Sequence, residues 1–211
     1  MSTTRGPRGP YAKSAAKRQQ IVDAALAAYA EAGSRAVSVR DIAERVGLTD
    51  AGVLHHFGGR EALLTAVLEA RDAAAAERHG EGAAMWRPEL IAENAQTPGL
   101  VKLFVDLAAA AAEPGHPAHD FFTERYQVLR HRYAEAIADA PSPDTASAAA
   151  QGAAPDAQWA ARVLLAATDG LQLQWLLDPS IDMAADITRL RDALLATVQG
   201  AGAPTGDGPT A

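Results

Sequence analysis

The most constraining feature of this sequence is the spacing of its apolar residues, which recur at steps of three and four along most of the chain. This period places apolar side chains on one face of an α-helix, whereas a half-buried strand would alternate every second residue. The strongest stripe comprises Phe122, Tyr126, Leu129, Tyr133 and Ile137. No segment follows the strand pattern, so the sequence predicts an all-α protein of about nine helices.

Glycine, proline and polar capping residues divide the pattern into separate helices. Ser38, Thr49, Thr97 and Asp182 stand where side chains commonly cap a helix start. Low-complexity stretches at 140–155 and after residue 200 predict a loop and a disordered tail. The predicted helices span residues 13–32, 39–46, 50–57, 60–78, 88–94, 98–111, 117–138, 156–177 and 183–198.

Charge is distributed unevenly, although the chain as a whole carries a net charge of −7. Residues 1–60 hold nine Lys or Arg and five Asp or Glu. The rest of the chain holds ten Lys or Arg and 21 Asp or Glu. A basic head on an acidic body suits a protein that approaches phosphate with one end. The alternative is a solvated basic tail without a partner.

Several classes of protein are disfavoured. The chain has no cysteine, which excludes disulfide scaffolds and cysteine-based zinc sites or nucleophiles. Charges interrupt every apolar stretch well before the roughly 20 residues of a membrane span. Residues 1–11 lack the apolar core of a secretory signal. We therefore expect a cytoplasmic location.

The segment most indicative of function is 38–57, SVRDIAERVGLTDAGVLHHF. It reads as a short helix, a glycine turn and a second short helix capped by Thr49, which is the layout of a helix-turn-helix. Ala51 and Gly52 are small enough to let the second helix approach a groove wall. Its N-terminal amides would face phosphate. The segment predicts DNA binding.

Residues 39–64 closely resemble the DNA-binding motif of TetR-type regulators. The matching residues are Ile42-Ala43, Gly47-Leu48-Thr49, Leu54-His55-His56-Phe57 and Arg60-Glu61-Ala62-Leu63-Leu64. Leu54 replaces the family's usual aromatic residue, and Arg60 replaces a commoner lysine. The resemblance covers residues 13–66 and extends more weakly to 169–179.

The resemblance implies roles for individual residues. Ser38, Arg40, Thr49 and Arg60 would contact phosphates, while Asp50, Ala51, Gly52 and His55 would face base edges. Leu54 would contact a thymine methyl or leave one phosphate contact missing. Asp50 could instead only stabilise its helix N-terminus. The core would contain Val39, Ile42, Val46, Val53 and Phe57. Further phosphate contacts would come from Arg5, Arg8, Lys13, Lys17 and Arg18.

The resemblance also implies a division into domains. Residues 1–12 would be a disordered basic arm, 13–60 the DNA-binding domain, 61–200 a ligand-binding and dimerisation domain, and 201–211 a disordered tail. The function expected is a repressor that binds a palindromic operator as a homodimer and is released by a small-molecule effector. No metal or cofactor is expected. The effector pocket would be lined by Trp86, Phe104, Phe122, Tyr126, Leu129, Asp169, Gln172 and Trp175.

The dimer would form through the last two helices, residues 156–177 and 183–198, because both carry wider apolar faces than a surface helix needs. The apolar residues concerned are Trp159, Val163, Leu164, Leu171, Trp175, Ile187, Leu190, Leu194 and Val198. The alternative is that these are core helices of a monomer.

Three alternative functions stay open. The same head fits a transcriptional activator, and a basic head fits an interaction module for an acidic protein. A small helical enzyme could use the cluster His116, His119 and Asp120, although no nucleophile motif or phosphate loop accompanies it. We expect this cluster to begin a helix, and we expect no enzymatic activity.

Overall fold

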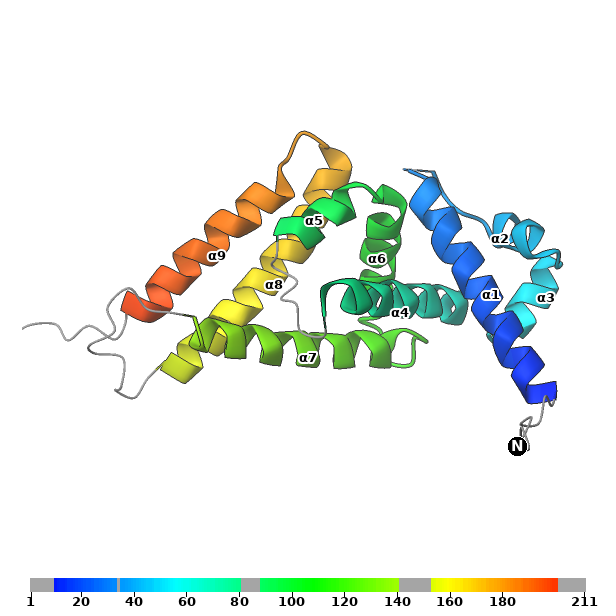
Figure 1. Cartoon of the computed structure of the whole chain (residues 1–211), viewed down its shortest axis with the longest axis horizontal. Helices are drawn as coiled ribbons and strands as arrows, with labels where there is room; N and C mark the ends of the chain where they lie inside the picture. The colour runs from blue at the N-terminus through cyan, green and yellow to red at the C-terminus, as the bar shows by residue number, and fades with distance from the viewer. Residues whose placement is uncertain (1–9, 34, 81–87, 141–152, 201–211) are drawn as a thin grey trace, which may run out of the picture. The chain divides into compact units, whose positions relative to one another are not determined.

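The computed structural model describes residues 10–33, 35–80, 88–140 and 153–200. Within these ranges every regular element is an α-helix, which confirms the predicted all-α class (Figure 1). The nine helices are α1 (Pro10–Glu31), α2 (Val39–Val46), α3 (Asp50–His55), α4 (Arg60–His79), α5 (Pro88–Ala95), α6 (Pro98–Ala110), α7 (His119–Ala138), α8 (Ala153–Leu177) and α9 (Met183–Gly200).

Most predicted helix boundaries are correct to within a few residues. Helix α1 begins at Pro10, three residues earlier than expected, since proline needs no amide partner in a first turn. The predicted cap at Thr97 is wrong. Its side chain makes no capping hydrogen bond, and its hydroxyl donates to the Asn94 carbonyl at 3.4 Å. The Asp182 cap is confirmed, with Oδ1 accepting from the Ala185 amide at 3.0 Å.

The chain divides into two compact units. The first comprises Met1–Glu81 with Asn94–Phe122, and the second comprises Gly82–Glu93 with Thr123–Ala211. Helices α1 to α4 and α6 therefore belong to the first unit. Most of α5 and α7, together with α8 and α9, belongs to the second.

The first unit is built around α1, which packs against α2, α4 and α6. Its most deeply buried side chains include Ile21 of α1, Val53 of α3, Leu63 of α4 and Phe104 of α6. Helix α6 approaches α1 closely at Gly99, where an added Cβ would lie 2.2 Å from the Tyr29 carbonyl oxygen. This core holds the short helices α2 and α3 on one side of α1 (Figure 1).

The second unit has α8 and α9 side by side (Figure 1). Tyr133 of α7, Leu164 of α8 and Ile187 of α9 are almost completely buried. No helix in the described part of the chain combines the length and apolar character that a membrane crossing requires. The predicted arm residues Arg5 and Arg8, Trp86, the tail 201–211 and residues 141–152 of the predicted loop 140–155 lie outside the described residues. The loop prediction is wrong for residues 153–155, which belong to the first turn of α8.

Candidate nucleic-acid interface

Local interactions define both ends of helix α2. The Ser38 hydroxyl accepts from the Asp41 amide at 3.1 Å, and Asp41 Oδ2 accepts from the Ser38 amide at 2.8 Å, forming a capping box. The pKa of the Asp41 carboxyl is lowered by the hydrogen bond from the Ser38 amide and, next, by a bond that the Ser38 hydroxyl donates to the same oxygen at 2.7 Å. Gly47 ends the helix in a left-handed conformation with φ of 65°, which glycine adopts without strain.

Helix α3 begins with a second side-chain cap. Thr49 Oγ1 accepts from the Gly52 amide at 3.1 Å, as the sequence predicts. A Cβ at Gly52 would lie only 3.2 Å from that oxygen. The absence of a side chain at Gly52 therefore leaves room for the Thr49 capping bond, and it would also allow close approach to a groove. Sequence reasoning assigned it only the second role.

The side chains predicted to contact DNA are accessible on this head. Lys13, Ser38, Arg40, Thr49, Asp50, Ala51, His55 and Arg60 are exposed, and Gly52 and Leu54 are half-buried. Among the predicted core residues, Ile42, Val46, Val53 and Phe57 are buried. Val39 is only half-buried, so that part of the prediction is wrong, because the position lies at the edge of the buried stripe.

In the described part of the head, the ion pairs of Arg40, Arg45 and Arg60 are exposed to solvent. Arg40 Nε lies 3.1 Å from Glu44 Oε1, and this bond, with the nearby charge of Asp50, raises the pKa of the guanidinium. Arg60 lies 4.0 Å from the Glu61 carboxylate. Exposed pairs of this kind contribute little to stability. Both guanidinium groups are thus accessible to an incoming phosphate.

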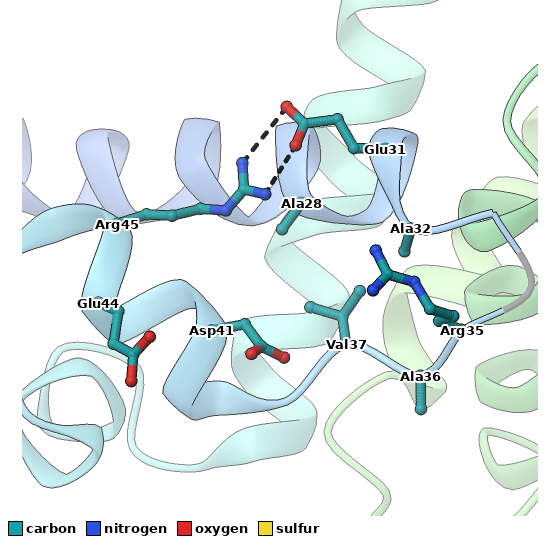
Figure 2. Close-up of a pocket in the computed structure, with 9 residues that line it drawn as sticks. All are labelled: Ala28, Glu31, Ala32, Arg35, Ala36, Val37, Asp41, Glu44 and Arg45. Atoms are coloured by element: carbon teal, nitrogen blue, oxygen red, sulfur yellow. Dashed lines mark hydrogen bonds and ion pairs between the residues drawn. The ribbon is translucent and has the colours of Figure 1, made fainter.

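A polar hollow of about 470 Å³ lies between the end of α1 and helix α2, and sequence reasoning did not identify it (Figure 2). Arg45 spans its edge with two hydrogen bonds to Glu31, at 2.7 and 3.3 Å. These bonds lower the pKa of the Glu31 carboxyl. The pair ties α2 to α1. The hollow is lined by Ala28, Glu31, Ala32, Arg35, Ala36, Val37, Asp41, Glu44 and Arg45.

The residues predicted to line an effector pocket fall into separate groups. Phe104 and Phe122 lie in the first unit, with ring centroids 5.5 Å apart. The guanidinium of Arg71 lies 5.2 Å from the centre of the Phe104 ring. The remaining described members, Tyr126, Leu129, Asp169, Gln172 and Trp175, belong to the second unit.

In the second unit, the predicted polar residues belong to a cluster shared by α7 and α8. The Tyr126 hydroxyl donates to Asp169 Oδ2 at 2.6 Å. Burial, followed by the charge of Asp169, raises the pKa of Tyr126. Gln172 and Arg125 are both buried. Sequence reasoning missed Arg125, although it lies three residues after Phe122, within the spacing of the buried stripe.

The cluster His116, His119 and Asp120 forms a helix start, as expected. The His116 ring accepts from the Ala118 amide at 3.1 Å, and His119 Nδ1 lies 2.9 Å from the Ala111 carbonyl oxygen. Asp120 lies in the first turn of α7. Among the described residues, no group of three or more potential ligands is arranged to hold a metal ion.

The apolar faces of α8 and α9 pack largely within the chain itself. Five of the residues named for the dimer interface are buried there: Leu164, Trp175, Ile187, Leu194 and Val198. Trp159 is 45 % exposed, and Leu173 and Leu177, which sequence reasoning did not name, are 48 % and 80 % exposed.

Comparisons with known proteins place the head within one family of regulators. The family model described as "Bacterial regulatory proteins, tetR family" matches residues 21–67. The chain is 31 % identical over 115 residues to the HTH-type transcriptional repressor AcnR of Corynebacterium diphtheriae, covering 54 % of this chain and 49 % of that protein. It is 36 % identical over 52 residues to the repressor KstR2 of Rhodococcus jostii, covering 25 % of this chain and 26 % of the relative.

These alignments span about half the length, or less, of the curated relatives. A solved structure of a putative TetR-family transcriptional regulator from Mesorhizobium loti extends the likeness to the fold. It covers 90 % of this chain and 98 % of that one, with a TM-score of 0.56 and 17 % sequence identity. At this identity the likeness concerns the fold alone.

Proposed function

We propose that this chain, which belongs to the TetR family of transcriptional regulators, represses transcription by binding a palindromic operator as a homodimer and leaves it when a small molecule binds the second unit. The observation that carries the proposal is the exposed helix α3. It has only one buried side chain, Val53, and is capped at its start by Thr49. A helix held in this way can lay its outer face in a major groove.

The side chains around α3 suit a division between phosphate and base contacts. Arg40 and Arg60 would neutralise phosphates on either side of the groove, while His55 and Leu54 would reach base edges. Ser38 and Thr49 use their hydroxyl oxygens as helix caps. Each could also donate its hydroxyl hydrogen to a phosphate, although the Ser38 hydroxyl already donates to Asp41 at 2.7 Å.

The dimer would use the outer face of α8. Trp159, Ala166, Gly170, Leu173 and Leu177 follow helical spacing and include the most exposed large apolar side chains. Small residues in the middle of such a stripe let two helices approach closely. A two-fold dimer would present two α3 helices to half-sites about 34 Å apart or a multiple of that distance.

The effector would bind the second unit near the polar cluster of Tyr126, Asp169 and Gln172. A half-buried carboxylate with a buried amide and guanidinium, in an apolar helical body, can fix the orientation of a small molecule. This chemistry favours an effector with both hydrogen-bonding groups and an apolar body. An Asp169→Asn variant should keep operator affinity and lose its response to any compound that releases the wild type.

The dimer can be tested separately through Gly170. Nothing lies within 4 Å of a Cβ built at this helical position, so Gly170→Glu should leave the subunit folded. We expect sedimentation to show a dimer for the wild type and a monomer for this variant. Gln158→Glu adds the same charge on an exposed part of α8 away from the stripe and should remain dimeric. A dimeric Gly170→Glu would remove this face from the interface.

DNA binding is tested by gel shifts against DNA flanking the chain's own gene, with salt varied. A discrete, competitor-resistant shift that weakens as salt rises supports the proposal. We expect Gly170→Glu to lose most of this affinity, whereas Gln158→Glu keeps it. A folded dimer that gives no specific shift on this DNA would exclude an operator beside its own gene. If selection from random duplex DNA also yields no sequence that the protein binds specifically, operator recognition is refuted.

A further inference from the structure

Two neighbouring basic residues of α1 bind the ends of the helix-turn-helix. Lys17 Nζ donates to the Val46 carbonyl oxygen at 3.0 Å, and an Arg18 guanidinium nitrogen donates to the His56 carbonyl oxygen at 3.0 Å. Val46 is the last residue of α2, and His56 is the C-cap of α3. Carbonyls at a helix end lack partners within the helix and form its negative pole, so cations are favoured there.

Helix α3 depends on such end contacts more than a longer helix would. It has six residues, of which only Val53 is buried. One buried side chain anchors the helix at a point but leaves it able to roll about that point. The Thr49 cap fixes the first turn. A second contact at the far end is needed to fix the direction of the exposed face.

Arg18 supplies that second contact in two ways. Besides its bond to the His56 carbonyl, its guanidinium carbon lies 4.1 Å from the centre of the Phe57 ring. A guanidinium over an aromatic face is attracted by the ring's negative face. One side chain thus holds the two residues that follow α3, on the backbone of one and the ring of the other.

Helix α2 is also held by side chains of α1. Lys17 binds its last carbonyl, and Arg45, in its last turn, forms the two-bond pair with Glu31 near the end of α1 (Figure 2). The contacts from Lys17 and Glu31 reach α2 from points well separated along α1. Helix α1 therefore acts as a frame for both helices of the motif.

We propose that Arg18, supported by Lys17, is a positioning residue that sets the angle at which α3 enters the groove. This inference rests on the proposed function. It differs from the expectation that Lys17 and Arg18 contact phosphate as part of a basic arm. The two roles predict different dependences on salt and on sequence, because a phosphate contact neutralises charge on any DNA, whereas positioning matters only for reading bases.

The test compares Arg18→Ala with Lys13→Ala, a matched control that removes an exposed base from the same helix. Affinity is measured for the operator and for unrelated duplex DNA over a range of salt. We expect Arg18→Ala to weaken operator binding roughly three- to tenfold, the effect of losing one hydrogen bond. Non-specific affinity and the salt slope should stay close to the wild-type values.

If Lys13 contacts a phosphate, Lys13→Ala should reduce the salt slope by about one. It should also lose the same factor of affinity for the operator and for unrelated DNA. If Arg18→Ala shows that pattern instead, Arg18 is a phosphate contact and the inference is overturned. Arg18→Lys separates the two roles further. It keeps the charge but lacks the planar group over Phe57, so we expect only partial recovery of operator affinity.

A measurement without DNA keeps the inference independent of the proposed function. Amide hydrogen exchange should become faster over residues 53–58 in Arg18→Ala and stay unchanged in Lys13→Ala, because Arg18 contacts the two residues that follow α3. Unchanged exchange at these residues would overturn the inference even if the operator is bound. Faster exchange in a protein without specific DNA binding would support the positioning contact while refuting the proposed function.

Discussion

The close approach of α6 to α1 makes Gly99→Ala a sharp test of the first unit. A Cβ at this position would lie 2.2 Å from the Tyr29 carbonyl oxygen and 3.1 Å from the Gly33 carbonyl oxygen. The first distance is more than about 1 Å short of ordinary van der Waals contact. Both obstacles are backbone atoms, so no side-chain rotation can relieve the overlap and one helix must move.

The expected cost follows from two opposing effects. Overpacking of a close-packed site costs about 1–3 kcal/mol. Replacing glycine by alanine returns about 0.4–1 kcal/mol, because the unfolded chain loses conformational freedom. Because both obstacles are backbone atoms, the upper part of the overpacking range applies, about 2–3 kcal/mol. The net destabilisation is then about 1–2.6 kcal/mol, which lowers the unfolding temperature of a chain of this size by roughly 2–10 °C.

Thermal unfolding of the full chain measures this effect. Lys102→Ala is the control, because it also introduces alanine into α6 but at an exposed position, where the lysine pairs with Asp106 at 2.6 Å. Surface changes of this kind stay within about 0.5 kcal/mol. A Gly99→Ala protein that unfolds at or above the wild-type temperature would refute the close contact between α6 and α1.

Three further predictions concern single side chains. Asp41→Asn should lower stability at neutral pH. Because folding lowers the pKa of Asp41 from its ordinary value of 3.8, this difference should shrink as the pH falls through 3.8 and vanish below the lowered pKa of the folded protein; a difference that persists there would contradict the capping role. Arg40→Ala and Arg60→Ala should each reduce the salt slope of operator binding by about one, and unchanged slopes would remove both from the phosphate contacts. Tyr126→Phe should lower the unfolding temperature by roughly 2–8 °C, since a half-buried carboxylate loses a donor at 2.6 Å; an unchanged temperature would mean that solvent replaces the hydroxyl.

The head could be predicted from sequence because its signals are local. Ser38, Asp41 and Gly47 lie within ten residues of one another and determine where α2 begins and ends. Thr49 does the same for the start of α3. Such interactions depend on spacing along the chain, which a sequence displays directly.

The roles of Lys17 and Arg18 could not be predicted in the same way. Their partners lie 29 and 38 residues further along the chain, and both are backbone carbonyls that carry no signature in the sequence. Similarly, the apolar faces of α8 and α9 indicate burial, but the sequence does not show whether the chain's own helices or a second copy cover them. Trp175 and Leu194 contribute to the subunit's own core, while Trp159 stays exposed.

The most direct test of the account is selection of binding sites from random duplex DNA by the wild-type protein and by His55→Ala. Because His55 is exposed on α3, we predict that the wild type enriches a palindrome and that the variant changes the base preference at one symmetric pair of positions. Failure of the folded wild-type protein to enrich any sequence, even at low salt, would contradict operator recognition. An enriched sequence that is identical for both proteins would contradict the assignment of His55 to base reading.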